Sequence, residues 1–283
     1  MKHLETQGND RLYSSGTVSE DFTFNEQVAE VFDDMLDRSV PFYRTVMQAT
    51  AALIRQLAPP GGTVADLGCS TGTALLELAR LLPDMRLRLI GLDRAPAMLD
   101  KARRKAEMFC KDIEFRQQDI TSPDLAAQIA GADVILCSYT MQFIRPLLRQ
   151  SFVSSLHEAL ADGGLLFLNE KIICGHSLLN RKFINIYHDF KREQGYSELE
   201  IAAKREALEN VLIPFTAEEN LSLLRQGGFN WAEVYFRWIN FASFLAIKEG
   251  KAQDEMTLPS VSLPERLQGE NAGRAAMRSL SDS

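Results

Sequence analysis

Residues 64–73 read V-A-D-L-G-C-S-T-G-T, an apolar run followed by a glycine-rich turn. The run Val64–Leu67 predicts a buried strand, and residues 74–82 predict a helix directly after the turn. Gly68 and Gly72 permit backbone conformations that other residues avoid, and they let a ligand approach the backbone closely. Free N–H groups at the start of the helix can then face an anionic group such as a carboxylate. The pattern predicts a ligand-binding turn, although a plain strand-to-helix turn of an α/β protein has a similar sequence.

A second, mostly apolar run, residues 87–92, leads to Asp93, at the position where an acidic residue binds ribose hydroxyls in nucleotide-binding sheets. The turn reads D-x-G-x-S-x-G over residues 66–72 and lacks the full G-x-G-x-x-G fingerprint of dinucleotide-binding proteins. Together these features favour an S-adenosylmethionine site over a dinucleotide site. The alternative role for Asp93 is to cap the helix that opens near Pro96.

Composition limits the class of protein. The chain has 283 residues, of which 46% are hydrophobic, enough for a sizeable core in one domain with additions. A net charge of −7 disfavours direct binding to nucleic acid. The four cysteines and four histidines show no metal-ligand spacing, so we expect reduced thiols, a cytoplasmic location and no metal. We also expect no secretory leader and no membrane-spanning segment.

Strand and helix patterns alternate after the glycine-rich turn, which predicts an α/β fold with a doubly wound, mostly parallel, Rossmann-like sheet. Further strands are predicted at residues 113–116, 134–136 and 165–168, and helices are predicted to begin at Ala95 and Phe152. Ligands bind beyond the carboxyl ends of such strands. The polar residues at or near these ends are Asp66, Asp93, Asp119, Ser138 and Glu170.

The remaining segments divide the chain into an S-adenosylmethionine-binding domain, residues 21–248, and two flanking segments, residues 1–20 and 249–283, which we expect to be disordered. Residues 22–38 predict an amphipathic helix that either packs as a lid or lines the site. A second helix is predicted to end near Leu57, before a Pro-Pro-Gly-Gly break.

Residues 172–212 interrupt the alternation with a long helical insertion. An insertion at this edge of the sheet covers the site in one interpretation, and in the other it is a solvated, charged helix pair. The apolar runs 232–238 and 241–247 predict a closing β-hairpin.

Over roughly residues 21–248 the chain resembles the carboxy-S-adenosyl-L-methionine synthases, a branch of the S-adenosylmethionine-dependent, class I methyltransferase superfamily. The glycine-rich turn identifies only the superfamily, whereas the motifs from H-D-F-K-R onward are specific to this branch. The motifs that carry the resemblance are F-T-F-N-E-Q-V-A-E-V-F (22–32), R-S-V-P-F-Y (38–43), D-L-G-C-S (66–70), A-P-A-M (95–98), T-M-Q-F (140–143), H-D-F-K-R (188–192), G-Y-S-E-L-E-I (195–201) and K-R-E-A-L-E-N-V (204–211).

The resemblance implies a homodimer that converts S-adenosylmethionine and prephenate into carboxy-S-adenosylmethionine and phenylpyruvate. The product is expected to pass to a carboxymethyltransferase that modifies a tRNA wobble uridine, or to a specialised biosynthetic pathway. The family's carboxylate-binding arginine corresponds to Arg205, which acts either in its own chain or across the dimer. The family's cofactor contacts correspond to Tyr43, Gly68, Cys69, Ser70, Asp93, Arg94, Asp119 and Ile120. Ser138 and Arg94 each replace a family asparagine.

Each of these roles has a simpler alternative. Asp93 can accept hydrogen bonds from both ribose hydroxyls. Asp119 and Ile120 can bind the adenine amino group and ring, or Asp119 can belong to a turn. Cys69 is interpreted as a packing residue rather than a nucleophile. Tyr43 is a hydrogen-bond donor over the cofactor or a core aromatic residue.

Arg205 carries the most specific hypothesis, because a guanidinium binds a planar carboxylate through two hydrogen bonds. Its alternative is a surface ion pair with Glu209, four residues later. His188 and Asp189 are adjacent on a helix and are not expected to form a catalytic pair. Two other functions remain open on the residues alone: an S-adenosylmethionine-dependent methyltransferase acting on a small molecule or tRNA, and a cofactor-binding protein without turnover.

Overall fold

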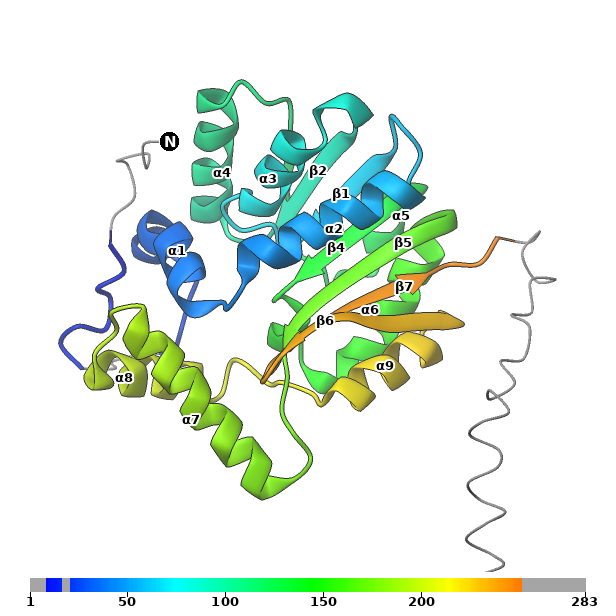
Figure 1. Ribbon diagram of the computed structural model, residues 1–283. Coiled ribbons are helices and arrows are strands. Elements are labelled where there is room, and N and C mark those ends of the chain that lie inside the picture. Colours follow the sequence, from blue (N-terminus) through cyan, green and yellow to red (C-terminus); the bar gives the residue numbers. More distant parts are fainter. Residues whose placement is uncertain (1–8, 17–20, 251–283) are drawn as a thin grey trace, which may run out of the picture. The chain divides into compact units, whose positions relative to one another are not determined.

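The computed structural model describes residues 9–16 and 21–250, and its centre is a seven-stranded sheet (Figure 1). The strand order is β3-β2-β1-β4-β5-β7-β6. Strands β1 to β5 are parallel, whereas β7 runs antiparallel to both β5 and β6. The strands are β1 (Thr63–Leu67), β2 (Arg88–Asp93), β3 (Glu114–Gln117), β4 (Ala132–Ser138), β5 (Leu160–Lys171), β6 (Trp231–Trp238) and β7 (Phe241–Ile247). The doubly wound, mostly parallel sheet predicted from the sequence is confirmed, as is the closing hairpin.

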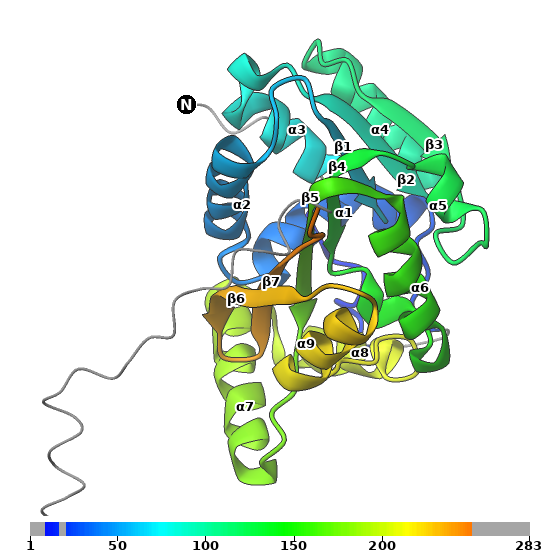
Figure 2. The ribbon, with the colours of Figure 1, turned by 90° about the vertical axis from the view of Figure 1, so that its right-hand side faces the viewer.

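Helices cover both faces of the sheet (Figures 1 and 2). Helices α2 (Tyr43–Leu57), α3 (Thr73–Leu81) and α4 (Pro96–Met108) pack on one face, and α5 (Leu125–Gln128), α6 (Pro146–Ala159) and α9 (Ala217–Gln226) on the other. Successive strand residues point to opposite faces, so Val64 packs with the first set of helices and Ala65 with the second. Both faces are buried, which explains why the parallel strands read as continuous apolar runs.

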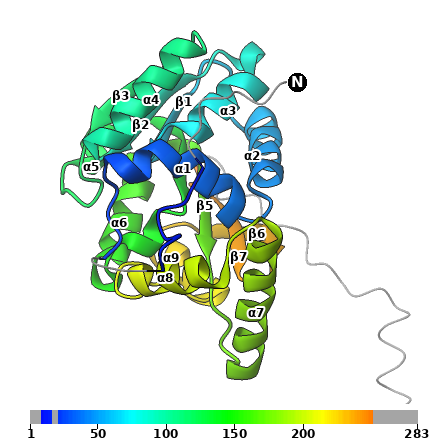
Figure 3. The same cartoon turned by 90° about the vertical axis from the view of Figure 1, so that its left-hand side faces the viewer.

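Three further helices lie beyond the carboxyl ends of the parallel strands: α1 (Glu26–Ser39), α7 (Ser177–Glu193) and α8 (Glu198–Leu208). Figures 1 and 3 show α1 between α4 and α8. An apolar cluster that includes Met35, Met98 and Ala207 joins α1, α4 and α8. The helices predicted in the insertion are therefore present, and α8 packs against α1.

Several element boundaries differ from the sequence prediction for local reasons. Helix α1 begins at Glu26 rather than Phe22, because the Asn25 side chain accepts the Val28 N–H and caps the helix. Helix α6 begins at Pro146 rather than Phe152, with the proline in its first turn. Helix α9 was not anticipated, although Thr216 and Glu219 form a capping box before it.

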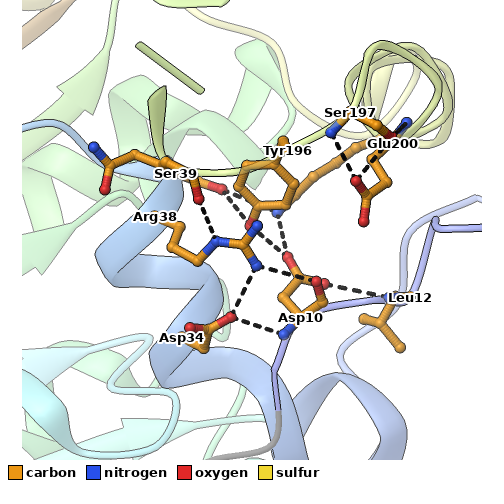
Figure 4. Close-up of polar contacts among 10 residues, drawn as sticks. Asp10, Leu12, Asp34, Arg38, Ser39, Tyr196, Ser197 and Glu200 are labelled. Carbon is orange, nitrogen blue, oxygen red and sulfur yellow. Dashed lines mark hydrogen bonds and ion pairs between the residues drawn. The ribbon is translucent and has the colours of Figure 1, made fainter. Parts of the chain in front are cut away.

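Residues 9–16 differ from the disorder that their composition predicts. Asp10 is only 2% exposed, and its backbone N–H donates to Asp34 Oδ2 at 2.7 Å. The Tyr196 hydroxyl donates to Asp10 Oδ2 at 2.5 Å, and Arg38 Nη1 donates to the Asp10 carbonyl at 3.2 Å. Figure 4 shows these contacts joining the segment to α1 and to the start of α8. The rest of the predicted N-terminal disorder, and the predicted tail beyond residue 250, lie outside the described residues.

Candidate functional site

A cavity of about 780 Å³ opens at the carboxyl ends of the parallel strands, with walls from α1, α7 and α8. Its volume lies within the range of small-molecule and cofactor sites. Most of the residues that the sequence singled out for binding or catalysis line this cavity, whereas Gly72 and Glu170 do not. The residues that line it include Tyr43, Gly68, Cys69, Ser70, Asp93, Arg94, Asp119, Ile120, Ser138 and Arg205.

The glycine-rich turn forms one wall. Gly68 has φ +72°, and a Cβ at this position would lie 2.6 Å from the Thr140 side chain, so no larger residue fits without displacement. The backbone N–H groups of Gly68 and Cys69 both donate to the Leu92 carbonyl, which ties the turn to the end of β2. Ser70 also has positive φ, +48°. Positive φ is costly for a non-glycine residue and is typical of functional turns.

Asp93 holds the turn and borders the cavity. Its Oδ2 accepts the Ser70 N–H and its Oδ1 accepts the Ala95 N–H, both at 2.9 Å. Ala95 precedes helix α4 (Pro96–Met108), and α4 has no side-chain cap, so the capping role of the alternative interpretation is not seen. Each carboxylate oxygen of Asp93 keeps a second acceptor site. Burial raises the pKa of Asp93, and the two backbone hydrogen bonds offset part of that rise. The geometry leaves Asp93 able to accept hydrogen bonds from a bound ligand.

Asp33 of α1 does not line the cavity but supports the glycine-rich turn through hydrogen bonds to it. The sequence pattern did not identify this residue. Its Oδ1 accepts the hydroxyls of Thr71 and Thr73 at 2.7 and 2.6 Å, and Lys105 of α4 donates to both its oxygens. Burial would raise the pKa of Asp33, but the charge and hydrogen bonds of Lys105 and the two hydroxyls lower it. This buried ion pair joins α1, the glycine-rich turn and α4.

Asp119 and Ile120 follow β3 at another edge of the cavity. Asp119 Oδ1 accepts both the N–H and the hydroxyl of Thr121, which is the turn geometry of the simpler interpretation. Those hydrogen bonds lower the pKa of Asp119. Among the described residues Oδ2 has no hydrogen-bond partner, so it remains free to accept one. The exposed Arg94 lies close enough to lower the pKa of both Asp93 and Asp119.

Tyr43, the first residue of α2, and Ser138, the last residue of β4, both line the cavity. Tyr43 is buried, its ring centroid is 6.4 Å from that of Tyr139, and burial raises the pKa of its hydroxyl well above the usual value. The hydroxyl therefore stays protonated and can donate. Ser138 Oγ accepts a hydrogen bond from Asn169 Nδ2 at 2.8 Å. Burial, with the nearby Asp93 charge, raises the pKa of Asp66 to about 7.

Two more of the residues that the sequence singled out are buried: Glu170 near the end of β5 and Cys69 in the glycine-rich turn. Glu170 does not line the cavity: its oxygens accept the N–H groups of Met141 and Gln142, each at 3.0 Å, at the start of the short 3-10 helix η2 (Met141–Phe143). Burial raises its pKa to about 8. Cys69 is 5% exposed, and burial raises its thiol pKa well above the usual value, which agrees with a packing residue rather than a nucleophile.

Arg205 is exposed on α8 and lines the cavity. Within the described part of the chain it forms no ion pair with Glu209, so the surface-pair alternative is absent. Arg205 and His188 also line a neighbouring cavity of about 500 Å³ along α7. His188 and Asp189 do not pair; Asp189 instead accepts from Arg192 at 2.7 Å.

The sequence did not identify three lysines on the same wall: Lys171, Lys191 and Lys204. Lys171 ends β5, one residue after the Glu170 that the strand-end pattern had marked, and the other two lie within the H-D-F-K-R and K-R-E-A-L-E-N-V motifs. Their spacing along the chain gives no sign that they converge.

Among the described residues no group of three or more His, Cys, Asp or Glu side chains is arranged to hold a metal ion. In the same residues, no helix combines the length and apolar character needed to cross a membrane.

Comparison with known proteins supports the superfamily and a branch within it. Residues 64–164 match the family described as "Methyltransferase domain". A Desulfotalea psychrophila protein named carboxy-S-adenosyl-L-methionine synthase is 50% identical over 245 residues, which cover 86% of this chain and 98% of that relative. A Sulfurimonas denitrificans protein of the same name is 46% identical over 240 residues, covering 85% of this chain and all of that relative.

The fold is shared more widely. Human N-acetylserotonin methyltransferase, solved in complex with S-adenosylmethionine, aligns with a TM-score of 0.55 at 15% identity, covering 87% of this chain and 64% of that chain. At this identity the likeness concerns the fold alone. It agrees with the open, mostly parallel sheet and its flanking helices.

Proposed function

Because this chain belongs to the carboxy-S-adenosyl-L-methionine synthase family, we propose that it converts S-adenosylmethionine and prephenate into carboxy-S-adenosylmethionine and phenylpyruvate. The observation that carries the proposal is Arg205, a guanidinium that lines the cavity and has no carboxylate partner among the described residues. A guanidinium pairs with a planar carboxylate through two hydrogen bonds, so Arg205 is suited to hold a carboxylate beside the acceptor carbon, and methyl transfer involves no such group.

The cavity suits S-adenosylmethionine in its size and in the chemistry of its walls. Asp93 would accept the ribose hydroxyls, and Asp119 Oδ2 the adenine amino group, with Ile120 against the ring. The start of α3, which has no side-chain cap and whose Thr73 and Ala74 line the cavity, would receive the methionine carboxylate. This assignment is supported by the free acceptor sites on both carboxylates.

The proposed reaction balances without a protein base. When prephenate loses carbon dioxide its ring becomes aromatic and the ring hydroxyl leaves as hydroxide. The hydroxide takes a proton from the sulfonium-bound methyl group to give water, and that carbon then forms a bond to the carbon dioxide. The protein contributes orientation and exclusion of water. Arg205 would hold the carboxylate, and α1, α7 and α8 would limit the escape of carbon dioxide.

We further propose that the enzyme is a homodimer and that its product passes to a carboxymethyltransferase acting on tRNA, without direct contact between this chain and nucleic acid. The negative net charge supports the last point. Exposed apolar side chains on α7, among them Leu178 and Ile186, support association through this helix. Sedimentation equilibrium would return twice the chain mass if the proposal is correct.

Mass spectrometry tests the activity directly. Incubation with S-adenosylmethionine and prephenate should give a nucleoside heavier by the mass of one carbon dioxide, together with phenylpyruvate. Prephenate labelled with carbon-13 in its ring carboxylate should transfer the label to the nucleoside. A methyltransferase would leave S-adenosylmethionine unchanged on addition of prephenate and would release S-adenosylhomocysteine with a methyl acceptor. A protein without turnover would return both compounds unchanged.

A further inference from the structure

Four cationic side chains converge on the cavity wall formed by the end of β5, α7 and α8: Lys171, Lys191, Lys204 and Arg205. Three of them come from the helical insertion, which Figure 1 shows on the opposite side from α3 and the turn before it. They are therefore distinct from the groups assigned to the methionine end of S-adenosylmethionine. A cluster of like charges in a largely buried wall is unfavourable unless anions compensate it.

Only one of the four has a carboxylate partner among the described residues. Lys204 Nζ lies 3.4 Å from Asp10 Oδ2 and 3.1 Å from Ser39 Oγ, so its charge is compensated within the protein. Asp10 Oδ2 also accepts the Tyr196 hydroxyl. Lys204 is therefore a structural cation that joins α8 to the segment of Asp10. The Asp10 carboxylate is already occupied by Lys204 and Tyr196, so it does not compensate the other cations by a direct contact.

Lys191 and Lys171 have no such partner in the described part of the chain. Lys191 is 7% exposed, with Nζ 4.8 Å from the Tyr187 ring centroid, and Lys171 Nζ lies 5.3 Å from the same centroid. Both ammonium groups thus lie near one aromatic ring, next to the cavity. Burial, and then the neighbouring Lys204 and Lys171, lower the pKa of Lys191 well below its usual value. Burial, and then Arg205, lower the pKa of Lys171 to about 8.

We propose that Lys171 and Lys191 form a second anion site, which binds the 2-oxo acid carboxylate of the substrate while Arg205 holds the carboxylate that is transferred. The inference rests on the proposed function, since prephenate carries two carboxylates and loses only one. Arg205 provides one cationic position and the Lys171–Lys191 pair provides the other, so the cavity has one position for each carboxylate of prephenate. The carboxylate that stays on the product, phenylpyruvate, binds at the lysine pair.

The arrangement also accounts for selectivity. A monocarboxylate that could give up carbon dioxide would engage Arg205 and leave the buried Lys191 and the half-buried Lys171 without an anion. A site built around a charged substrate group discriminates strongly against a molecule that lacks that group, because its own buried charges then remain unpaired. The lysine pair is therefore a specificity determinant for dicarboxylates.

Steady-state kinetics of Lys171→Met and Lys191→Met test the proposal. Each should raise the KM for prephenate by about tenfold or more, the effect of losing one charge-assisted hydrogen bond, and should leave the KM for S-adenosylmethionine within about twofold. Inhibition by phenylpyruvate should weaken in parallel, because phenylpyruvate retains the carboxylate assigned to this pair. The matched control is Lys182→Met, an exposed lysine of α7 outside the cavity, which should change neither constant.

A second readout separates binding from a structural role. Because both lysine pKa values are lowered in the free protein, an anion bound between the ammonium groups raises them and takes up protons. Titration of phenylpyruvate into the protein saturated with S-adenosylhomocysteine, in buffers of different ionisation enthalpy at pH 8, should show proton uptake. The uptake should fall in Lys171→Arg, because arginine stays protonated at this pH while its positive charge preserves binding.

The outcomes are separable from those of the proposed function. If the wild type makes carboxy-S-adenosylmethionine while both methionine variants keep their prephenate KM and phenylpyruvate inhibition within about twofold, the lysine site is refuted and the proposed function stands. If the wild type makes no carboxy-S-adenosylmethionine, the proposed function fails, and the lysine site is tested by calorimetric titration of prephenate into protein loaded with S-adenosylmethionine. Prephenate binding that is present in the wild type and lost in both methionine variants supports the lysine site. Absence of prephenate binding to the wild type, or binding that both variants retain, overturns the lysine site.

Discussion

Asp10 offers a test of how the wall of the cavity is held together. In Asp10→Asn the shape of the side chain is preserved, but the buried Lys204 loses the charge that compensates it at 3.4 Å. Asp10 and Lys204 are 2% and 6% exposed, so solvent does little to replace the lost partner. Removing one member of a buried ion pair costs about 3 to 5 kcal/mol. The amide oxygen of the substituted side chain can still accept from Tyr196, so we expect the low end, about 3 kcal/mol.

The assay is thermal unfolding by calorimetry, supported by urea denaturation. For a chain of this size each kcal/mol shifts Tm by about 2 to 4 °C, so the expected loss is about 6 to 12 °C. Asp37→Asn is the matched control, because Asp37 pairs with Arg44 on the exposed side of α1 and should cost at most about 1 kcal/mol. If Asp10→Asn is no more destabilising than Asp37→Asn, residues 9–16 do not support the wall and the reasoning is refuted.

Three further predictions concern the turn, its support and the anion site. Gly68→Ala should abolish measurable binding of S-adenosylmethionine in calorimetric titration, because the new Cβ meets Thr140 at a backbone φ of +72°; retained affinity would contradict the close packing. Asp33→Asn should lower the free energy of unfolding by about 3 kcal/mol in urea denaturation, since Lys105 loses its buried partner; a loss below about 1 kcal/mol would contradict the contribution assigned to that pair. The kcat/KM for prephenate should fall as pH rises through about 8, where Lys171 loses its proton, and the fall should be smaller in Lys171→Arg, in which only Lys191 of the pair can titrate; a profile shared by both proteins would exclude Lys171 as its cause. The charged and titratable groups near Lys171 are Arg205, Lys191 and His188, with the ring of Tyr187.

The parallel sheet and its ligand edge are predictable from sequence because both depend on local patterns. The apolar run Val64–Leu67 is buried on both faces, and the glycine turn after it needs the positive φ found at Gly68. Once the strands are parallel, the polar residues at their ends must meet at one edge. Asp93 and Asp119, far apart in sequence, reach one cavity for this reason.

The wall opposite the turn depends on contacts that no local pattern reveals. Lys204 and Asp10 are 194 residues apart, and Asp10 lies in a polar segment that is typical of disorder. Lys191 belongs to a charge-rich helix, where the usual expectation is a solvated side chain, yet it is buried against Tyr187. Asp33 likewise reads as the polar side of an amphipathic helix. Each becomes informative only when the packing of α1, α7 and α8 is known.

Carboxyl transfer by an Arg205→Ala variant provides the most direct test of the chemistry. With S-adenosylmethionine and carbon-13-labelled prephenate, we expect the variant to bind S-adenosylmethionine with an affinity within about threefold of the wild type. We expect it to form labelled carboxy-S-adenosylmethionine about a hundredfold more slowly, the cost of removing one group that stabilises charge in a reaction. Labelled product at the wild-type rate would contradict the role of the Arg205 guanidinium in holding the transferred carboxylate.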